Sequence, residues 1–188
     1  MKSRVMVLSV ASLVFAGVAS AEVRKGDVVL DLLAGWMQQS YSDEFDVGDL
    51  NVYFAALRPG IALTDHIRVA GVAAVAHVAN ILGGDVTAWT LGVSGEYVFM
   101  PANALNPYIG GMFAWAKGDP DGGIFDVVIG DKDGWLLAPR AGLLYTLNRA
   151  NNLFVEFQYQ FWGGGLDDIL DHGFMLLGGI EHKFKVGP

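Results

Sequence analysis

The segment LFVEFQYQF, residues 153–161, has the pattern that decides the fold. One face carries leucine, valine, phenylalanine, tyrosine and a second phenylalanine, whereas the opposite face carries Glu156, Gln158 and Gln160. A period of two indicates a β-strand with one apolar face. The segment WTLGVSGEYVF, residues 89–99, repeats the pattern, with large apolar side chains opposite threonine, glycine, serine and glutamate.

The same periodicity along the chain predicts eight strands and therefore an all-β fold. Short turns and long loops alternate, so the short turns share one end of the predicted sheet and the long loops share the other. The 25 glycines argue against long helices. The strands are expected at residues 27–39, 50–63, 67–77, 86–99, 107–117, 134–147, 152–162 and 173–184, with short turns at 64–66, 101–106 and 148–151 and long loops at 40–49, 78–85, 118–133 and 163–172.

The face opposite the apolar one distinguishes a membrane barrel from a soluble sandwich. In a soluble protein that face meets water and is rich in Lys, Glu and Thr. Here it holds mostly glycine, alanine, leucine and methionine with one or two charges per strand, as in Ala138, Arg140, Gly142, Leu144 and Thr146. Small residues with isolated charges fit the narrow lumen of an eight-stranded barrel. We therefore predict an eight-stranded antiparallel up-and-down transmembrane β-barrel.

The charges that fall on the predicted inner face balance. Charges inside a barrel have to be paired, so a neutral set predicts an ion-paired, closed lumen. Arg140 is expected to pair with a glutamate on an adjacent or facing strand, and Glu156 on the next strand is the first choice. The lumen ion-pair candidates are Arg58, Arg68, Arg140 and Lys183 together with Asp31, Glu96, Glu156 and Glu181.

Aromatic residues gather near both ends of the predicted strands, as in the aromatic girdles of transmembrane barrels. Tyr108 is grouped with the aromatics of the short-turn end. Trp162 has the parity of the inner face, and a bulge or a position above the membrane is the expected explanation. The girdle is expected to comprise Trp36, Trp89, Trp115, Trp135, Tyr97, Phe99, Tyr145 and Phe184.

The N-terminus and the composition point to export. Lys2 and Arg4 precede an apolar stretch at residues 5–18, which ends in the small-residue sequence Ala19–Ala21. We predict a cleaved signal peptide at 1–21 and one barrel domain at 22–188; the apolar stretch is shorter than the roughly 20 residues of a spanning helix. Hydrophobic residues make up 53% of the chain, and cysteine is absent. A disulfide scaffold and a thiolate metal site are thereby excluded, and the net charge of −8 disfavours nucleic acid as a partner.

The signal sequence, the eight alternating strands, the strand opening NPYIGG at 106–111 and the final amphipathic strand at 173–184 resemble one family. This family is the small eight-stranded outer-membrane barrels of Gram-negative bacteria, similar to the barrel domain of outer membrane protein A and to its X relative. The resemblance implies location in the cell outer membrane, contact with outer-membrane lipid and lipopolysaccharide, and insertion by the barrel-assembly machinery. In such barrels the last aromatic, here Phe184, is read during assembly; four residues follow it in this chain.

Some barrels of this size modify lipids, and that chemistry requires a nucleophile and a base. Barrel-type lipid A deacylases are recognised by a His-x-Ser pair, and no such pair occurs in this sequence. Ser42 and Asp43 with His77 or His172 form a weaker acyl-transfer combination. Ser94, one inner position from Glu96, is expected to make a hydrogen bond inside the barrel. We therefore predict no catalytic residues, no cofactor and no enzyme activity.

The predicted long loops are acidic, and this predicts an exposed surface that contacts a partner or is bridged to lipopolysaccharide by divalent ions. Two turns, DPDG at 119–122 and DKDG at 131–134, have carboxylates and glycine as calcium turns do, without the full spacing of a calcium loop. His172 beside Asp171 is not expected to bind a metal. The acidic residues are Asp43, Glu44, Asp46, Asp49, Asp85, Asp119, Asp121, Asp126, Asp131, Asp133, Asp167, Asp168 and Asp171.

Three functional hypotheses follow from these patterns. The first is a structural and surface-interaction protein that anchors acidic external loops on a closed barrel. The second is a narrow outer-membrane channel or a conduit for hydrophobic solutes. The third is a lipid-modifying barrel enzyme. Bilayer conductance separates the first two, and mass spectra of lipid A from cells that express the protein test the third.

Overall fold

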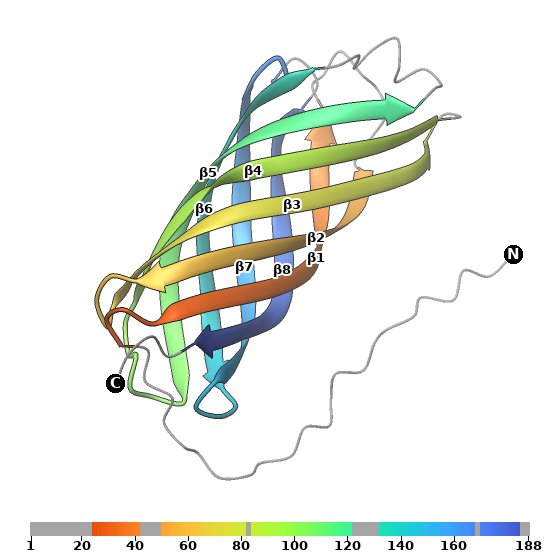
Figure 1. The fold of residues 1–188 in the computed structure, drawn as a ribbon. Coiled ribbons are helices and arrows are strands. Elements are labelled where there is room, and N and C mark those ends of the chain that lie inside the picture. The colour runs from red at the N-terminus through yellow and green to blue at the C-terminus, as the bar shows by residue number, and fades with distance from the viewer. Residues whose placement is uncertain (1–23, 42–49, 82–83, 122–131, 168–169, 185–188) are drawn as a thin grey trace, which may run out of the picture.

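The computed structural model describes residues 24–41, 50–81, 84–121, 132–167 and 170–184, which form a closed antiparallel barrel (Figure 1). Each strand pairs with its neighbours in the chain, and β8 closes the barrel against β1. The predicted fold class is confirmed. The strands are β1 (Val28–Tyr41), β2 (Leu50–Ala62), β3 (Ile67–Ile81), β4 (Gly84–Val98), β5 (Leu105–Asp121), β6 (Asp133–Thr146), β7 (Asn151–Gly164) and β8 (Leu170–Phe184).

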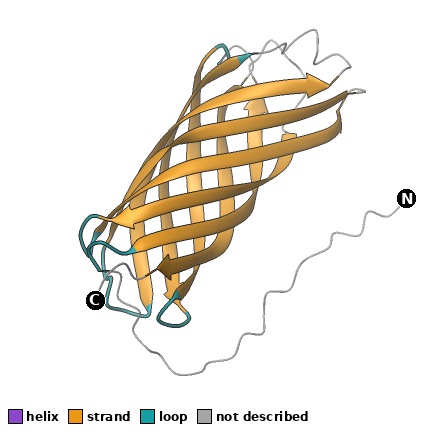
Figure 2. Cartoon of the chain, in the orientation of Figure 1, coloured by secondary structure: helices purple, strands orange, loops and turns teal. Residues whose placement is uncertain are grey.

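Strands and loops account for all of the described secondary structure (Figure 2). In these residues there is no helix with the length and apolarity needed to cross a membrane. The predicted signal peptide and the acids Asp43, Glu44, Asp46, Asp49, Asp126, Asp131 and Asp168 lie outside the described residues.

Several strands are longer than the sequence pattern predicted. The loop expected at 78–85 is wrong, because β3 continues to Ile81 and β4 begins at Gly84, with Ile81 paired to Gly84. Backbone pairing continues past the point where side-chain alternation fades, since the ladder depends on backbone hydrogen bonds. For the same reason several acids assigned to loops belong to strand ends, namely Asp85, Asp119, Asp121, Asp133 and Asp171.

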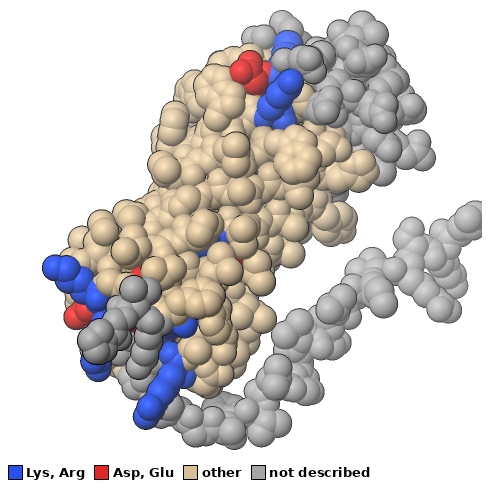
Figure 3. All heavy atoms as spheres, viewed as in Figure 1, with Lys and Arg blue, Asp and Glu red and all other residues tan. Residues whose placement is uncertain are grey.

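The two faces of the barrel differ as a membrane protein requires. Along β6, Leu136, Ala138 and Arg140 are almost fully buried in the lumen, whereas Leu137 between them is 47% exposed. Figure 3 shows that the charged side chains of one face gather at its two ends, with an almost entirely uncharged band between them. An apolar belt flanked by polar ends matches the hydrocarbon core of a bilayer.

Two apolar clusters fill much of the lumen, so the barrel is packed rather than hollow. One contains Leu33, Val98, Tyr108, Leu144, Phe154, Met175 and Leu177. The other contains Val72, Met112, Ala114, Leu136 and Ala138, with Trp162 packed against it. Trp162 therefore faces the lumen, and neither a bulge nor a position above the membrane is needed to explain its parity.

The aromatic residues assigned to the girdle lie on the outer side of the strands. Trp89, Trp115 and Trp135 are exposed toward the long-loop end, and Trp36 contacts Phe174 edge to face. Tyr97, Phe99, Tyr145 and Phe184 are exposed toward the short-turn end. Tyr108 does not belong with them: it is only 2% exposed and faces the lumen, because it has the inner parity of β5.

The outer face of β4 permits a test of orientation. Leu91 is 67% exposed, whereas its neighbour Thr90 has the lumen-facing parity and is half-buried. An arginine facing the centre of a bilayer costs about 2 to 4 kcal/mol, so Leu91→Arg is expected to lower the free energy of unfolding by that amount and Thr90→Arg by less. Urea titration of the barrel refolded in phospholipid vesicles measures both. A larger loss for Thr90→Arg than for Leu91→Arg would show that the assigned faces are inverted, and equal losses would contradict the expected difference between them.

Candidate functional site: a charged layer across the lumen

The lumen contains a layer of buried polar side chains, one from each strand. We call these eight residues the lumen layer. They lie in the half of the barrel nearer the short turns. Two of the carboxylates, Glu156 and Glu181, are each only 1% exposed. In chain order the lumen layer comprises Asp31, Arg58, Arg68, Glu96, Tyr108, Arg140, Glu156 and Glu181.

Two of the ion pairs join neighbouring strands directly. Asp31 of β1 and Arg58 of β2 are register partners, and Arg58 Nε lies 3.0 Å from Asp31 Oδ2. Arg68 of β3 and Glu96 of β4 are also register partners, and Arg68 Nη2 lies 2.6 Å from Glu96 Oε1. Side chains directly opposite each other on one face are the closest cross-strand neighbours, so these pairs follow from the register alone.

Two further ion pairs cross the lumen. Arg58 Nη1 on β2 lies 3.0 Å from Glu156 Oε1 on β7, and Arg68 on β3 reaches Glu181 on β8. Each bond joins strands that are separated by two others around the barrel wall. Only a closed, narrow barrel brings such strands within reach of one another. These ion pairs therefore link parts of the barrel wall that are not neighbours in the sheet.

Gly110 on β5 allows Arg140 to reach a glutamate two strands away. In the register, Gly110 lies between Glu96 of β4 and Arg140 of β6. A Cβ atom at this position would lie 2.3 Å from the carbonyl oxygen of Gly95 and 3.0 Å from the Cβ of Glu96. Because glycine has no side chain, Arg140 Nη2 passes over β5 and lies 2.9 Å from Glu96 Oε2.

Gly142 on β6 has the same relation to Tyr108 and Glu156. It is the register partner of Tyr108 on one side and of Glu156 on the other. A Cβ on Gly142 would lie 2.5 Å from the Tyr108 ring, so the ring occupies the space that a side chain would take. The Tyr108 hydroxyl thereby donates a 2.6 Å hydrogen bond to Glu156 Oε2 across the intervening strand.

Glu156 is the hub of the lumen layer. Arg58 Nη1 donates to both of its carboxylate oxygens at 3.0 Å, and Arg140 Nη1 donates to Oε2 at 3.1 Å. Tyr108 and Gln158 add hydrogen bonds of 2.6 Å. A buried carboxylate is stable only when its charge is paired and its lone pairs are satisfied. The two arginines pair the charge of Glu156, and all four donors satisfy its lone pairs.

Together the contacts form one continuous chain of alternating charges. Lys183 on β8 is also buried in the lumen, at 4% exposure, so the inner face holds four cations and four carboxylates. Such a network cross-links the walls of the barrel. The order of contacts is Asp31, Arg58, Glu156, Arg140, Glu96, Arg68 and Glu181.

Solved structures with the same architecture are known. Neisserial surface protein A matches with a TM-score of 0.67 and 17% identity over 85% of this chain and 100% of that one. The outer membrane protein OprG from Pseudomonas aeruginosa matches with a TM-score of 0.56 and 18% identity over 87% and 98%. The outer membrane protein AlkL, solved in lipid bilayers, matches with a TM-score of 0.55 and 18% identity over 94% and 99%.

The fold is that of the small outer-membrane barrels. No protein-family model and no curated protein matches the sequence. The likeness in structure therefore concerns the architecture of the barrel alone.

Sequence reasoning did not identify three polar side chains as partners of the lumen carboxylates, although it placed Gln158 on the inner face. Tyr108 and Gln158 donate to Glu156, and Asn152 Nδ2 donates to Glu181. All three have the inner parity of their strands, so parity was the signal that assigns them to the lumen. Parity alone does not reveal which carboxylate each one meets, because that depends on the register between strands.

Ser42 and Asp43 of the acyl-transfer combination lie outside the described residues, so the structure does not test that combination. The Ser94 hydroxyl is buried in the lumen and makes no hydrogen bond there, so the expected bond inside the barrel is wrong. His66 and His182 lie at the short-turn end and bond to Val98 and Asn151, whereas His77 lies at the long-loop end. Within the described ranges there is no group of three metal-binding side chains.

Proposed function

We propose that this protein is an outer-membrane barrel with a closed lumen that serves a structural and surface-interaction role. The observation that carries the proposal is the lumen layer, because every strand contributes a side chain to one connected network. Together with the buried Lys183, the inner face holds four cations and four carboxylates. A pore needs mobile water and accessible charge along its axis. Buried ion pairs that reach from wall to wall oppose both.

The surface role is proposed for the long-loop end. The acidic residues of the sequence concentrate there. Divalent cations would bridge their carboxylates to the phosphates of lipopolysaccharide. Lipopolysaccharide is therefore one partner that we propose, and a further surface partner is the other. The name of the neisserial neighbour, a surface protein, fits this role. Removal of residues 1–21 by a signal peptidase and insertion by the barrel-assembly machinery complete the proposal, which includes no catalytic step.

Conductance of the refolded protein in planar bilayers tests the closed lumen. We expect no unitary conductance steps above those of bilayers that receive boiled protein, because an ion would have to displace the Arg58–Glu156 and Arg68–Glu181 bonds. Reproducible steps of one size would contradict the closed lumen.

A narrow conduit is the second candidate. It is favoured by the small lumen-facing residues toward the long-loop end, such as Ala74, Ala76, Ala88 and Ala116, although Leu136 and Trp162 pack in the same half. The charged layer nevertheless lies between this half and the short turns. The conduit therefore requires the lumen layer to rearrange.

A further inference from the structure

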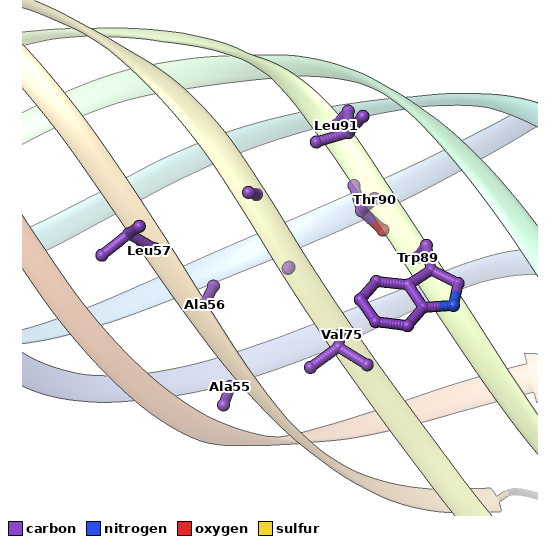
Figure 4. A pocket seen from close by; sticks show the side chains of 9 residues that line it. Ala55, Ala56, Leu57, Val75, Trp89, Thr90 and Leu91 are labelled. Carbon is purple, nitrogen blue, oxygen red and sulfur yellow. The ribbon is translucent and has the colours of Figure 1, made fainter.

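An apolar groove of about 540 Å³ lies along β2, β3 and β4, and six of its nine lining residues have the lipid-facing parity (Figure 4). Its floor is formed by Ala73, which lies in register between Leu57 of β2 and Leu91 of β4. Figure 4 shows these two leucines on either side of β3, with Trp89 farther along β4. The groove forms because the floor residue is small and the residues on its sides are large. Leu91 and Trp89 project from the surface and are 67% and 57% exposed.

The groove ends at a row of polar side chains toward the long loops. Tyr53, His77 and Thr87 are successive register partners on β2, β3 and β4. They lie two residues beyond the groove residues Ala55, Val75 and Trp89, and therefore share the outer face with them. Tyr53 is 72% exposed, and His77 Nδ1 lies 3.1 Å from Thr87 Oγ1. The phenol, the imidazole and the hydroxyl all provide hydrogen-bond donors.

The position of these rows matches the depth profile of a bilayer. Tryptophan and tyrosine prefer the boundary between hydrocarbon and headgroups, and Trp89 and Tyr53 occupy the last apolar and first polar rows. Lys117, the exposed register partner of Trp89 on β5, lies beside this row and is itself in register with Asp133 of β6. The surface therefore offers an apolar channel followed by a row of hydrogen-bond donors, which is complementary to an acyl chain attached to a phosphate.

We propose that this groove is a binding site for one phosphate-bearing membrane lipid, whose acyl chain packs over Ala73 and whose phosphate meets Tyr53, His77 and Thr87. The site is continuous with the apolar belt of the barrel, so its occupant enters from the surrounding leaflet. Van der Waals packing against the floor and hydrogen bonds at the headgroup hold the lipid, since lipid tails gain little from hydrophobic transfer within a membrane. The proposal rests on the membrane location proposed above.

Native mass spectrometry tests the site. The protein is refolded in vesicles of phosphatidylglycerol, extracted in mild detergent and examined for retained lipid. We expect a species with one phosphatidylglycerol bound, and we expect Ala73→Phe, which fills the floor, to lower its fraction by about tenfold. Ala141→Phe is the matched control, because Ala141 is an exposed alanine on the outer face of β6 and should leave retention unchanged.

A second variant tests the headgroup contact. The double variant Tyr53→Phe, His77→Ala removes two hydrogen-bond donors but leaves the groove intact. It is expected to reduce the retention of phosphatidylglycerol. Retention of diacylglycerol, which lacks the phosphate, should stay unchanged. Heat-dependent migration on a detergent gel first shows that each variant has folded and inserted, so failure of membrane insertion is distinguished from failure of binding. Equal retention by Ala73→Phe and the parent protein, or a dimer in place of the lipid-bound species, would overturn the proposal.

Discussion

Replacing Glu156 by leucine is expected to cause the largest loss of stability among substitutions in the lumen layer. The carboxylate receives hydrogen bonds from Arg58, Arg140, Tyr108 and Gln158, and leucine removes all of them. Breaking one buried ion pair costs about 3 to 5 kcal/mol, and each orphaned buried donor costs about 1 to 3 kcal/mol. We therefore expect the free energy of unfolding to fall by at least about 5 kcal/mol.

Urea titration in phospholipid vesicles measures this loss. Two further variants show whether the loss is caused by removal of the buried carboxylate. Glu156→Gln keeps an acceptor oxygen and similar volume, so its loss should be intermediate. Val155→Leu changes the adjacent lipid-facing residue, which is 47% exposed, and should alter the free energy of unfolding by no more than about 0.5 kcal/mol. If Glu156→Leu is as stable as Val155→Leu, the hub is not formed in the membrane.

The barrel was predictable from sequence because its main determinant is local. In residues 153–161 the side-chain period fixes which residues face lipid and which face the lumen, and the same rule holds around the barrel. The limits of the strands were less predictable. The pairing of Ile81 with Gly84 depends on backbone hydrogen bonds that continue beyond the apolar alternation, so a loop was expected where strands are present.

The membership of the lumen layer was largely predictable, but its connections were not. Parity placed Arg58 and Glu156 on the inner face, yet their contact joins β2 to β7 and depends on the closure and stagger of the whole barrel. The roles of Gly110 and Gly142 likewise follow from register. Each glycine lies between two partners that meet across its strand, and nothing in the local sequence shows which residues lie opposite.

Arg140→Met is the second large effect, and its size depends on which charges remain. Arg140 links Glu156 to Glu96. Without it, Glu156 keeps Arg58 and Tyr108, and Glu96 keeps Arg68, but the lumen retains one uncompensated negative charge. We expect a loss of up to about 3 to 5 kcal/mol, the range for a broken buried pair, and a smaller loss than for Glu156→Leu. The same urea titration measures it.

The double variants then distinguish the two partners of Arg140. Both Glu96→Gln and Glu156→Gln restore neutrality in the Arg140→Met background, but their other contacts differ. Glu96 has only arginine partners, and Arg68 keeps Glu181 when Glu96 is neutral, whereas neutralising Glu156 deprives Arg58 of its cross-lumen partner. Rescue should therefore be greater with Glu96→Gln, although Glu156 was the partner expected from strand adjacency. If Arg140→Met alone is neutral and neither substitution changes its stability, Arg140 lies in water, the lumen is open, and transport becomes the better account of the barrel.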